Sequence, residues 1–165
     1  MLYILVGLPA TGKSEVAKIL SRKNRAVVLS EDEILRELYP KPTHSAKERQ
    51  RVYEEMFVRA RKLLKSGKEA VLDATFIKKS NREKASSLAK SAGVDYRLIE
   101  VTAPEEQIKQ RLRKRYHREG NDADWSVYLK YKKGFEPIFE RHRVFNNSGN
   151  LAEIRKQLEK GQKST

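Results

Sequence analysis

The sequence predicts an α/β domain built on a mainly parallel β-sheet with helices on both faces. Short apolar runs alternate with stretches of helical spacing from end to end. Three of these runs lack the polar alternation of a half-exposed strand, which indicates strands buried on both faces. Strands separated by helices form right-handed βαβ units, and their sheet is then parallel. We expect the 165 residues to form a single domain, 1–165.

The first elements follow directly from local signals. An apolar strand over 2–6 runs into a glycine-rich turn, and a helix is predicted over 14–21. The second strand, 26–29, ends at Ser30. The Ser30 side chain can cap the next helix, predicted over 31–38, which carries acidic residues in its first turn.

The longest predicted helix covers residues 45–65. Apolar side chains recur along it every three or four positions, from Val52 to Leu63, and Gly67 ends it. Its apolar face therefore predicts a long helix packed on the sheet.

The second half of the chain repeats the alternation of strands and helices. Pro104 suits the start of a helix, with Thr102 as a cap and with Glu105 and Glu106 near the positive end of the helix dipole. The predicted strands here are 70–72, 96–101 and 141–146. The predicted helices are 80–91, 104–118 and, closing the chain, 151–160.

Composition excludes several classes of protein. The chain has no cysteine, so it forms no disulfide, thiolate metal site or cysteine nucleophile. Its longest apolar run is far shorter than the ~20 residues that span a bilayer, and nothing in it resembles a cleavable signal. We therefore expect a cytoplasmic protein that does not contact a membrane. No protein partner is evident.

The net charge points to an anionic partner. Lys and Arg number 36 against 22 Asp and Glu, which makes the formal net charge +14. A field of that sign recruits anions, and nucleic acid is the obvious large one. The alternative is a heavily charged, heat-adapted surface.

Residues 7–14 fit the phosphate-binding pattern G-x-x-x-x-G-K-[S/T] and follow the first strand. The glycines let the backbone curl so that its N–H groups point at the phosphates of a nucleotide. Lys13 then reaches the β- and γ-phosphates, and the Ser14 hydroxyl is a ligand for Mg²⁺. The predicted nucleotide-binding residues of this loop are Gly7, Leu8, Pro9, Ala10, Thr11, Gly12, Lys13 and Ser14.

Acidic residues follow the second and third strands. Asp32 and Glu33 come after the second strand, and the carboxyl ends of such strands face the ligand crevice. A carboxylate there can accept the proton of an attacking hydroxyl, although capping the helix is an alternative role. Asp73 ends the third strand and is a candidate Mg²⁺ ligand. Its alternative role is to orient the acceptor hydroxyl or a substrate-binding arginine.

Arginines gather at the end of the helix predicted over 104–118. Arg111 and Arg115 lie one helical turn apart, just before a polar loop. A planar guanidinium there can bridge phosphate oxygens from a lid, which we place at about 115–133, with Arg115 as the catalytic residue. A solvated basic face or an RNA-binding stripe is the alternative. Helical spacing also relates three aromatic side chains expected to pack in the core or the lid: Trp125, Tyr128 and Tyr131. Stacking on a nucleic-acid base is the alternative.

In the order of these motifs the chain resembles the kinase domain of 5′-polynucleotide kinases and the wider group of zeta-toxin-like and AAA-type predicted kinases. The similarity covers nearly the whole length. It implies a P-loop kinase fold with five parallel strands, and ATP with Mg²⁺ as cosubstrates. By matching position it also implies that Asp32 is the general base, that Arg36 and Asp73 handle the acceptor, and that Arg115 acts on the transferring phosphate.

The same resemblance assigns the loop after the last strand. Residues 146–149 are similar to the loop that holds adenine in related kinases, which makes Asn147 and Gly149 candidate nucleotide contacts beside Arg111. One spacing departs from the group: the arginine often follows the base by three residues, whereas Arg36 follows Asp32 by four and Glu33 by three. Either acid can therefore be the base.

These observations predict an ATP- and Mg²⁺-dependent kinase that transfers the γ-phosphoryl group to a hydroxyl. The favoured acceptor is a nucleic-acid 5′-hydroxyl, at an RNA or DNA end. A small-metabolite kinase is the alternative, and an NTPase without an acceptor is a third possibility. The choice between ATP and GTP stays open.

Overall fold

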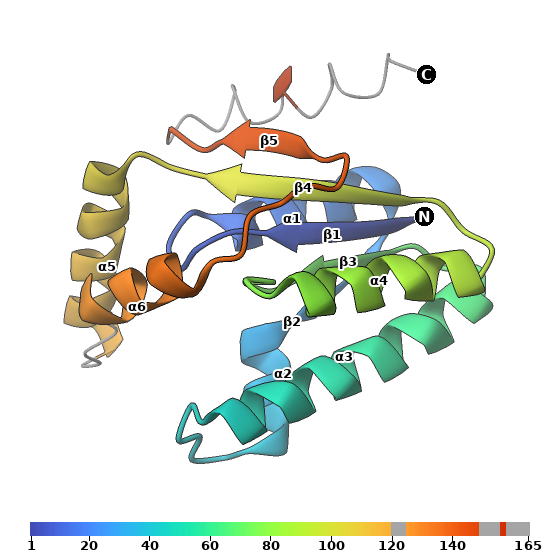
Figure 1. The fold of residues 1–165 in the computed structure, drawn as a ribbon, viewed down its shortest axis with the longest axis horizontal. Helices are drawn as coiled ribbons and strands as arrows, with labels where there is room; N and C mark the ends of the chain where they lie inside the picture. Colours follow the sequence, from blue (N-terminus) through green and yellow to red (C-terminus); the bar gives the residue numbers. More distant parts are fainter. Residues whose placement is uncertain (120–124, 149–155, 158–165) are drawn as a thin grey trace.

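The computed structural model describes residues 1–119, 125–148 and 156–157, and for 115–119 it describes the backbone alone. Five parallel strands form one sheet in the order β2-β3-β1-β4-β5 (Figure 1). This confirms the predicted sheet. The strands are β1 (Leu2–Val6), β2 (Val27–Ser30), β3 (Ala70–Asp73), β4 (Tyr96–Thr102) and β5 (Arg143–Asn146).

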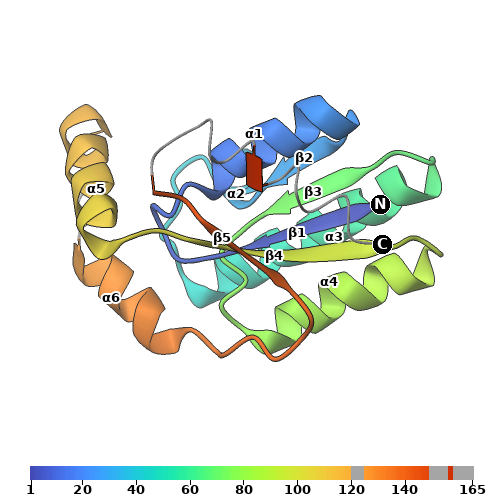
Figure 2. The same ribbon diagram turned by 90° about the horizontal axis from the view of Figure 1, so that it is seen from above.

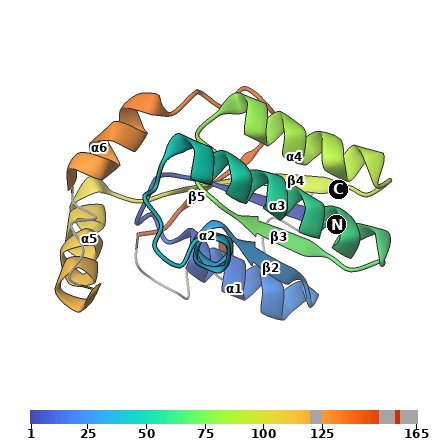
Figure 3. The same cartoon turned by 90° about the horizontal axis from the view of Figure 1, so that it is seen from below.

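Helices cover both faces of the sheet. Successive side chains of β1 point to opposite faces, so Leu2 and Ile4 enter one apolar core while Tyr3 and Leu5 enter the other. The first core packs against α3 (Ala46–Lys65) and α4 (Lys79–Ser91), which lie side by side (Figure 3). The second core packs against α1 (Lys13–Asn24).

Two helices lie beyond the carboxyl ends of the strands. These are α5 (Glu105–Glu119) and α6 (Trp125–Gly134), which Figure 2 shows past the ends of β1 and β4. The rings of Trp125 and Tyr128 stack with their centres 4.7 Å apart, and both residues join a small apolar cluster with Ile108 of α5. The expected packing of these two aromatic residues is confirmed, although their helix was not among the predicted elements.

The remaining boundaries agree closely with the predicted ones. The helix α2 (Glu31–Leu38) is capped by the Ser30 side chain, and α3 begins with a capping box between Ser45 and Glu48. The helix predicted over 151–160 lies outside the described residues except for 156–157. In the described part of the chain, no helix combines the length and the apolar character that a bilayer span requires.

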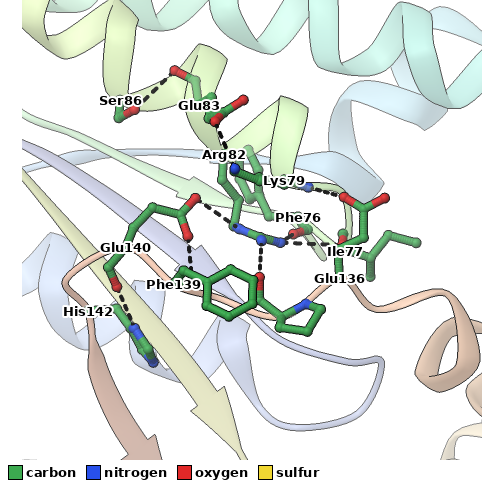
Figure 4. Close-up of polar contacts among 11 residues, drawn as sticks. Phe76, Ile77, Lys79, Arg82, Glu83, Ser86, Glu136, Phe139, Glu140 and His142 are labelled. Carbon is green, nitrogen blue, oxygen red and sulfur yellow. Dashed lines mark hydrogen bonds and ion pairs between the residues drawn. The ribbon is translucent and has the colours of Figure 1, made fainter.

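A buried arginine ties the turn after β3 to the segment that follows α6 (Figure 4). The side chain of Arg82 is 1% exposed, and it donates to the backbone oxygens of Phe76 at 3.0 Å and Pro137 at 2.8 Å. Its Nε also lies 3.6 Å from a carboxylate oxygen of Glu140. One guanidinium therefore holds together two segments that are far apart in the sequence.

A carboxylate from the same segment supports the start of α4. That helix has no side-chain cap of its own, and Glu136 accepts from the backbone N–H of Lys79 at 2.6 Å (Figure 4). Glu136 also accepts from Lys78 Nζ at 3.0 Å. The Glu136 N–H in turn donates to the backbone oxygen of Ile77 at 2.9 Å. These contacts fix the carboxyl end of α6 against the turn that leads out of β3.

Replacing the buried arginine tests this junction. Arg82→Met would leave the carbonyls of Phe76 and Pro137 without their donor and Glu140 without its cation, so we expect unfolding to become easier by about 3–5 kcal/mol. Urea denaturation monitored by circular dichroism measures this. Lys84→Met, at an exposed position of the same helix, is the matched control and should change stability little. Equal effects of the two substitutions would contradict this account.

Candidate active site

The phosphate loop (residues 7–14) joins β1 to α1 through a backbone that requires glycine. Gly12, directly before α1, has φ 92°, and a Cβ there would collide with the Asn147 side chain. A Cβ on Gly7 would collide with the backbone oxygen of Val101. The helix α1 has no side-chain cap, so no side chain accepts hydrogen bonds at the positive end of the helix dipole, where the loop ends. This geometry suits a bound phosphate.

Two side chains at the start of α1 reach the centre of the site. Lys13 Nζ donates to the Leu8 oxygen at 3.0 Å, which folds the ammonium group over the loop. Ser14 Oγ donates to Asp73 Oδ2 at 2.8 Å, so the two predicted Mg²⁺ ligands are in direct contact. Burial raises the pKa of Asp73, and the charge of Lys13 opposes this.

This pair fits a magnesium site that shares its ion with a nucleotide. A hydroxyl and a carboxylate are the hard oxygen donors that Mg²⁺ takes, and Mg²⁺ is usually held by one or two carboxylates together with phosphates and water. Across the residues that the structure describes, no three His, Cys, Asp or Glu side chains are grouped so as to hold a metal by themselves. Ser14 and Asp73 would therefore hold the ion together with its phosphate ligands.

The loop after β5 closes onto the phosphate loop. Asn147 is 3% exposed, its Nδ2 donates to the Thr11 oxygen at 2.9 Å, and its backbone N–H donates to the Thr102 oxygen at 2.7 Å. Arg111 Nη1 donates to the oxygens of Ala10 and Thr11, each at 3.1 Å, and its Nη2 donates to the Asn147 oxygen at 3.3 Å. Arg111 and Asn147, both predicted as nucleotide contacts, are thus brought together at this loop.

The structure does not describe the atoms of two predicted residues of this region that would contact the nucleotide. Gly149 and the side chain of Arg115 lie outside the described residues, as does the loop 120–124 of the predicted lid. Their roles stay predictions.

A cleft of about 180 Å³ opens beside the phosphate loop, between α2, α3 and α6. Five residues predicted from the sequence line it: Pro9, Lys13, Ser14, Asp32 and Asp73. The cleft therefore joins the phosphate loop to both acidic strand ends, as the position of these acids after β2 and β3 predicts.

The two candidate bases differ in position. Asp32 lines the cleft, whereas Glu33 does not and instead donates its backbone N–H to the Ser30 side chain in the cap of α2. Arg36 is exposed and outside the cleft lining, and its Nε donates to the backbone oxygen of Asp32 at 3.1 Å. The structure thus places Asp32 in the cleft lining and leaves Glu33 and Arg36 outside it.

The cleft also contains side chains for which the sequence predicts no role in catalysis. Glu31 lies beside Asp32, and its Oε2 accepts from the Thr75 N–H at 3.0 Å. Arg49 of α3 and Tyr131 of α6 face each other there, with the Arg49 guanidinium carbon 5.2 Å from the centre of the Tyr131 ring. Glu31 belongs to the acidic run that follows β2. The sequence offers Arg49 only as one of the basic residues of the long helix that could contact nucleic-acid phosphates, and it does not distinguish Arg49 from them, because charged residues are ordinary on a long exposed helix.

Comparison with known proteins identifies the family. The sequence matches the family AAA_33, described as an AAA domain, over residues 2–138. The chain belongs to this family. No curated protein sequence matches it significantly.

Solved structures show the fold of this AAA-domain protein. A gluconokinase from Sinorhizobium meliloti 1021 superposes with a TM-score of 0.72 at 18% identity, over 96% of this chain and 89% of its own. The Mycobacterium tuberculosis APS kinase CysC, in complex with AMPPNP and APS, superposes with a TM-score of 0.71 at 19% identity, over 99% and 97%. Kti12 from Chaetomium thermophilum, in complex with ADP-AlF3, has a TM-score of 0.76 at 17% identity, over 98% and 97%.

These likenesses confirm the predicted P-loop kinase fold, with its five-stranded parallel sheet flanked by helices. The finer resemblance to polynucleotide kinases is not confirmed by them.

The buried Glu31 carboxyl of the cleft makes the stability of this AAA-domain protein depend on pH. Burial raises the pKa of Glu31 above its ordinary value, and the N–H of Thr75 opposes this only in part. A carboxyl group whose pKa is raised on folding contributes stability that is complete below its unfolded pKa and is lost as the pH rises through its folded pKa.

Glu31→Gln should therefore raise the melting temperature of the unliganded protein at pH 7. Glutamine keeps an oxygen that accepts from Thr75 but carries no charge to bury. The gain should shrink as the pH falls toward about 4, where the wild-type carboxyl is also protonated. Thermal melts at several pH values measure this, with Glu106→Gln, at an exposed carboxyl, as the control. A gain that is independent of pH would contradict the assignment.

Proposed function

We propose that the protein is a kinase that transfers the γ-phosphoryl group of ATP, with Mg²⁺, to a hydroxyl of a small acceptor molecule. The observation that carries this proposal is that the phosphate loop and Asp32 line the same cleft. The reaction gains mainly from alignment and from charge stabilisation, and a cleft of this kind brings donor and acceptor together.

The phosphate loop and the segments that contact it would bind ATP. Lys13 would stabilise the negative charge that develops on the phosphates, with Arg115 as the proposed lid arginine. Mg²⁺, held by Ser14 and Asp73, would neutralise the phosphate oxygens. Arg111 and Asn147 lie where the loop after β5 meets the phosphate loop, and we assign the adenine side of ATP to that place.

Asp32 would act on the acceptor as the general base. Its carboxylate would take the proton of the acceptor hydroxyl as the hydroxyl oxygen forms a bond to the γ-phosphorus. The bond from that phosphorus to the oxygen bridging it to the β-phosphate then breaks, and ADP leaves.

Two observations favour a small acceptor over the nucleic-acid end that the net charge suggested. Two of the similar structures are named as a gluconokinase and an APS kinase. Moreover, Arg59, one of the basic residues available on α3 for phosphate contacts, is engaged by Glu37 at 2.6 Å and by Glu55 at 2.8 Å. Its charge is therefore locally compensated. A nucleic-acid acceptor and an NTPase without an acceptor become outcomes of the tests below.

Substitution of the base tests the mechanism. Asp32→Asn should lower kcat by roughly 10² or more with little change in ATP affinity, because Asp32 acts on the acceptor after ATP is bound. Glu33→Gln, at the adjacent acid outside the cleft, is the matched control and should lower kcat only slightly.

The lysine of the phosphate loop gives a second test. Lys13→Ala should fold and transfer almost no phosphate. The mechanism fails if Glu33→Gln is the more damaging change or if Lys13→Ala keeps full activity.

A salt series distinguishes the classes of acceptor. A single strand held by several Lys or Arg contacts loses affinity steeply as salt rises, with a log-log slope of about −0.7 per contact. We expect a 5′-hydroxyl oligonucleotide to be bound weakly and not phosphorylated, as measured by fluorescence anisotropy and by transfer from labelled ATP. Steep salt dependence together with transfer would establish the nucleic-acid acceptor instead. Binding without transfer would indicate a nucleic-acid-associated NTPase.

A further inference from the structure

We propose that the cleft contains a subsite for an anionic group of the acceptor, a carboxylate or a phosphate, and that Arg49 binds this group. The proposal rests on the proposed function, because it describes the acceptor end of the same cleft. It makes the acceptor a hydroxylated small molecule with an anionic group away from the reacting hydroxyl.

The first argument is that the Arg49 guanidinium uses few of its N–H donors within the described part of the protein. Arg49 is half-buried in the wall of the cleft, and its hydrogen bond within the described chain is from Nη2 to the His44 oxygen at 3.3 Å. A guanidinium carries five N–H donors in a rigid fork that matches the oxygens of a carboxylate or a phosphate. Most of this donor capacity is therefore available to a ligand in the cleft.

The second argument is charge. Among the residues that the structure describes, no carboxylate lies within ion-pair distance of Arg49. Two other arginines of the same helix are paired, since Arg51 contacts Glu54 at 3.6 Å and Arg59 contacts two glutamates. A partly desolvated cation that no carboxylate contacts directly favours an anionic ligand.

The third argument is the polarity of the cleft. Its acidic wall, formed by Glu31, Asp32 and Asp73, repels an anion, whereas Arg49 attracts one. The Glu31 carboxylate is itself held by the Thr75 N–H and lies beyond ion-pair distance from Arg49. An anionic acceptor would therefore bind in one orientation, with its negative group at Arg49 and a hydroxyl at Asp32.

The fourth argument is size. Arg49 of α3 and Tyr131 of α6 contact each other, and both line the cleft, which has a volume of about 180 Å³. Their contact links the two helices that form its sides. A volume of this size suits a small molecule.

Matched pairs of acceptors test the subsite without requiring turnover. The probes are gluconate with sorbitol, glycerate with glycerol, and glycerol 3-phosphate with glycerol, titrated calorimetrically into the protein loaded with Mg²⁺ and AMPPNP. We expect each anionic member to bind about tenfold or more tightly than its neutral partner, as expected for a charged hydrogen bond. The carboxylate and phosphate arms together show which anion the subsite prefers.

Variants of Arg49 assign the preference to this side chain. Arg49→Ala should remove the anion preference and leave AMPPNP affinity unchanged, and Arg49→Lys should restore part of the preference because it keeps the charge but not the fork. Arg51→Ala, two residues along the same helix and outside the cleft lining, should behave like the wild type. A wild-type protein without anion preference, or a preference that survives Arg49→Ala, would overturn the subsite.

The same panel separates this proposal from the proposed function. Transfer of phosphate to neutral acceptors, unaffected by Arg49→Ala, would retain the kinase and reject the subsite. Anion binding that depends on Arg49, with no transfer from ATP to any probe or oligonucleotide, would retain the subsite and count against the kinase.

Discussion

The parallel pairing of β3 with β1 on one side and with β2 on the other places Asp73 beside Leu5 and Ser30. Because all three strands run in the same direction, the phosphate loop, Asp73 and the start of α2 emerge at one edge of the sheet. The contact between Ser14 and Asp73 depends on this register. A shift of β3 by one residue would turn the Asp73 side chain to the other face of the sheet and separate the two oxygen donors.

Segments remote in the sequence then complete the site. The loop after β5 reaches the phosphate loop through Asn147, and the guanidinium of Arg111 joins the same place. On the opposite side, the Arg82 network fixes the carboxyl end of α6 to the turn that follows β3, and α6 presents Tyr131 to the cleft. The acceptor side of the cleft therefore depends on a buried arginine that does not itself line the cleft.

Much of the fold and the nucleotide side could be predicted because their signals are local. The phosphate loop is a contiguous pattern, and Asp73 ends an apolar strand, so both follow from spacing alone. The choice between Asp32 and Glu33 could not be made from spacing to Arg36, because it depends on which side of the first turn of α2 faces the cleft. The place of Arg49 in the cleft could not be predicted for a similar reason: it depends on the approach of Tyr131 from a helix more than 80 residues away, and no local pattern encodes that contact.

The central claim is that one cleft presents the γ-phosphate of ATP to Asp32. A crystal structure of the protein with Mg²⁺ and AMPPNP tests it most directly. The account predicts phosphates on the N–H groups of residues 7–14, Mg²⁺ at Ser14 and Asp73, adenine beside Arg111 and Asn147, and a γ-phosphate that faces the Asp32 carboxylate. A nucleotide bound elsewhere, such as in the separate cavity between β4 and α6 lined by Leu8, Tyr128 and Phe135, or a γ-phosphate turned away from Asp32, would contradict it.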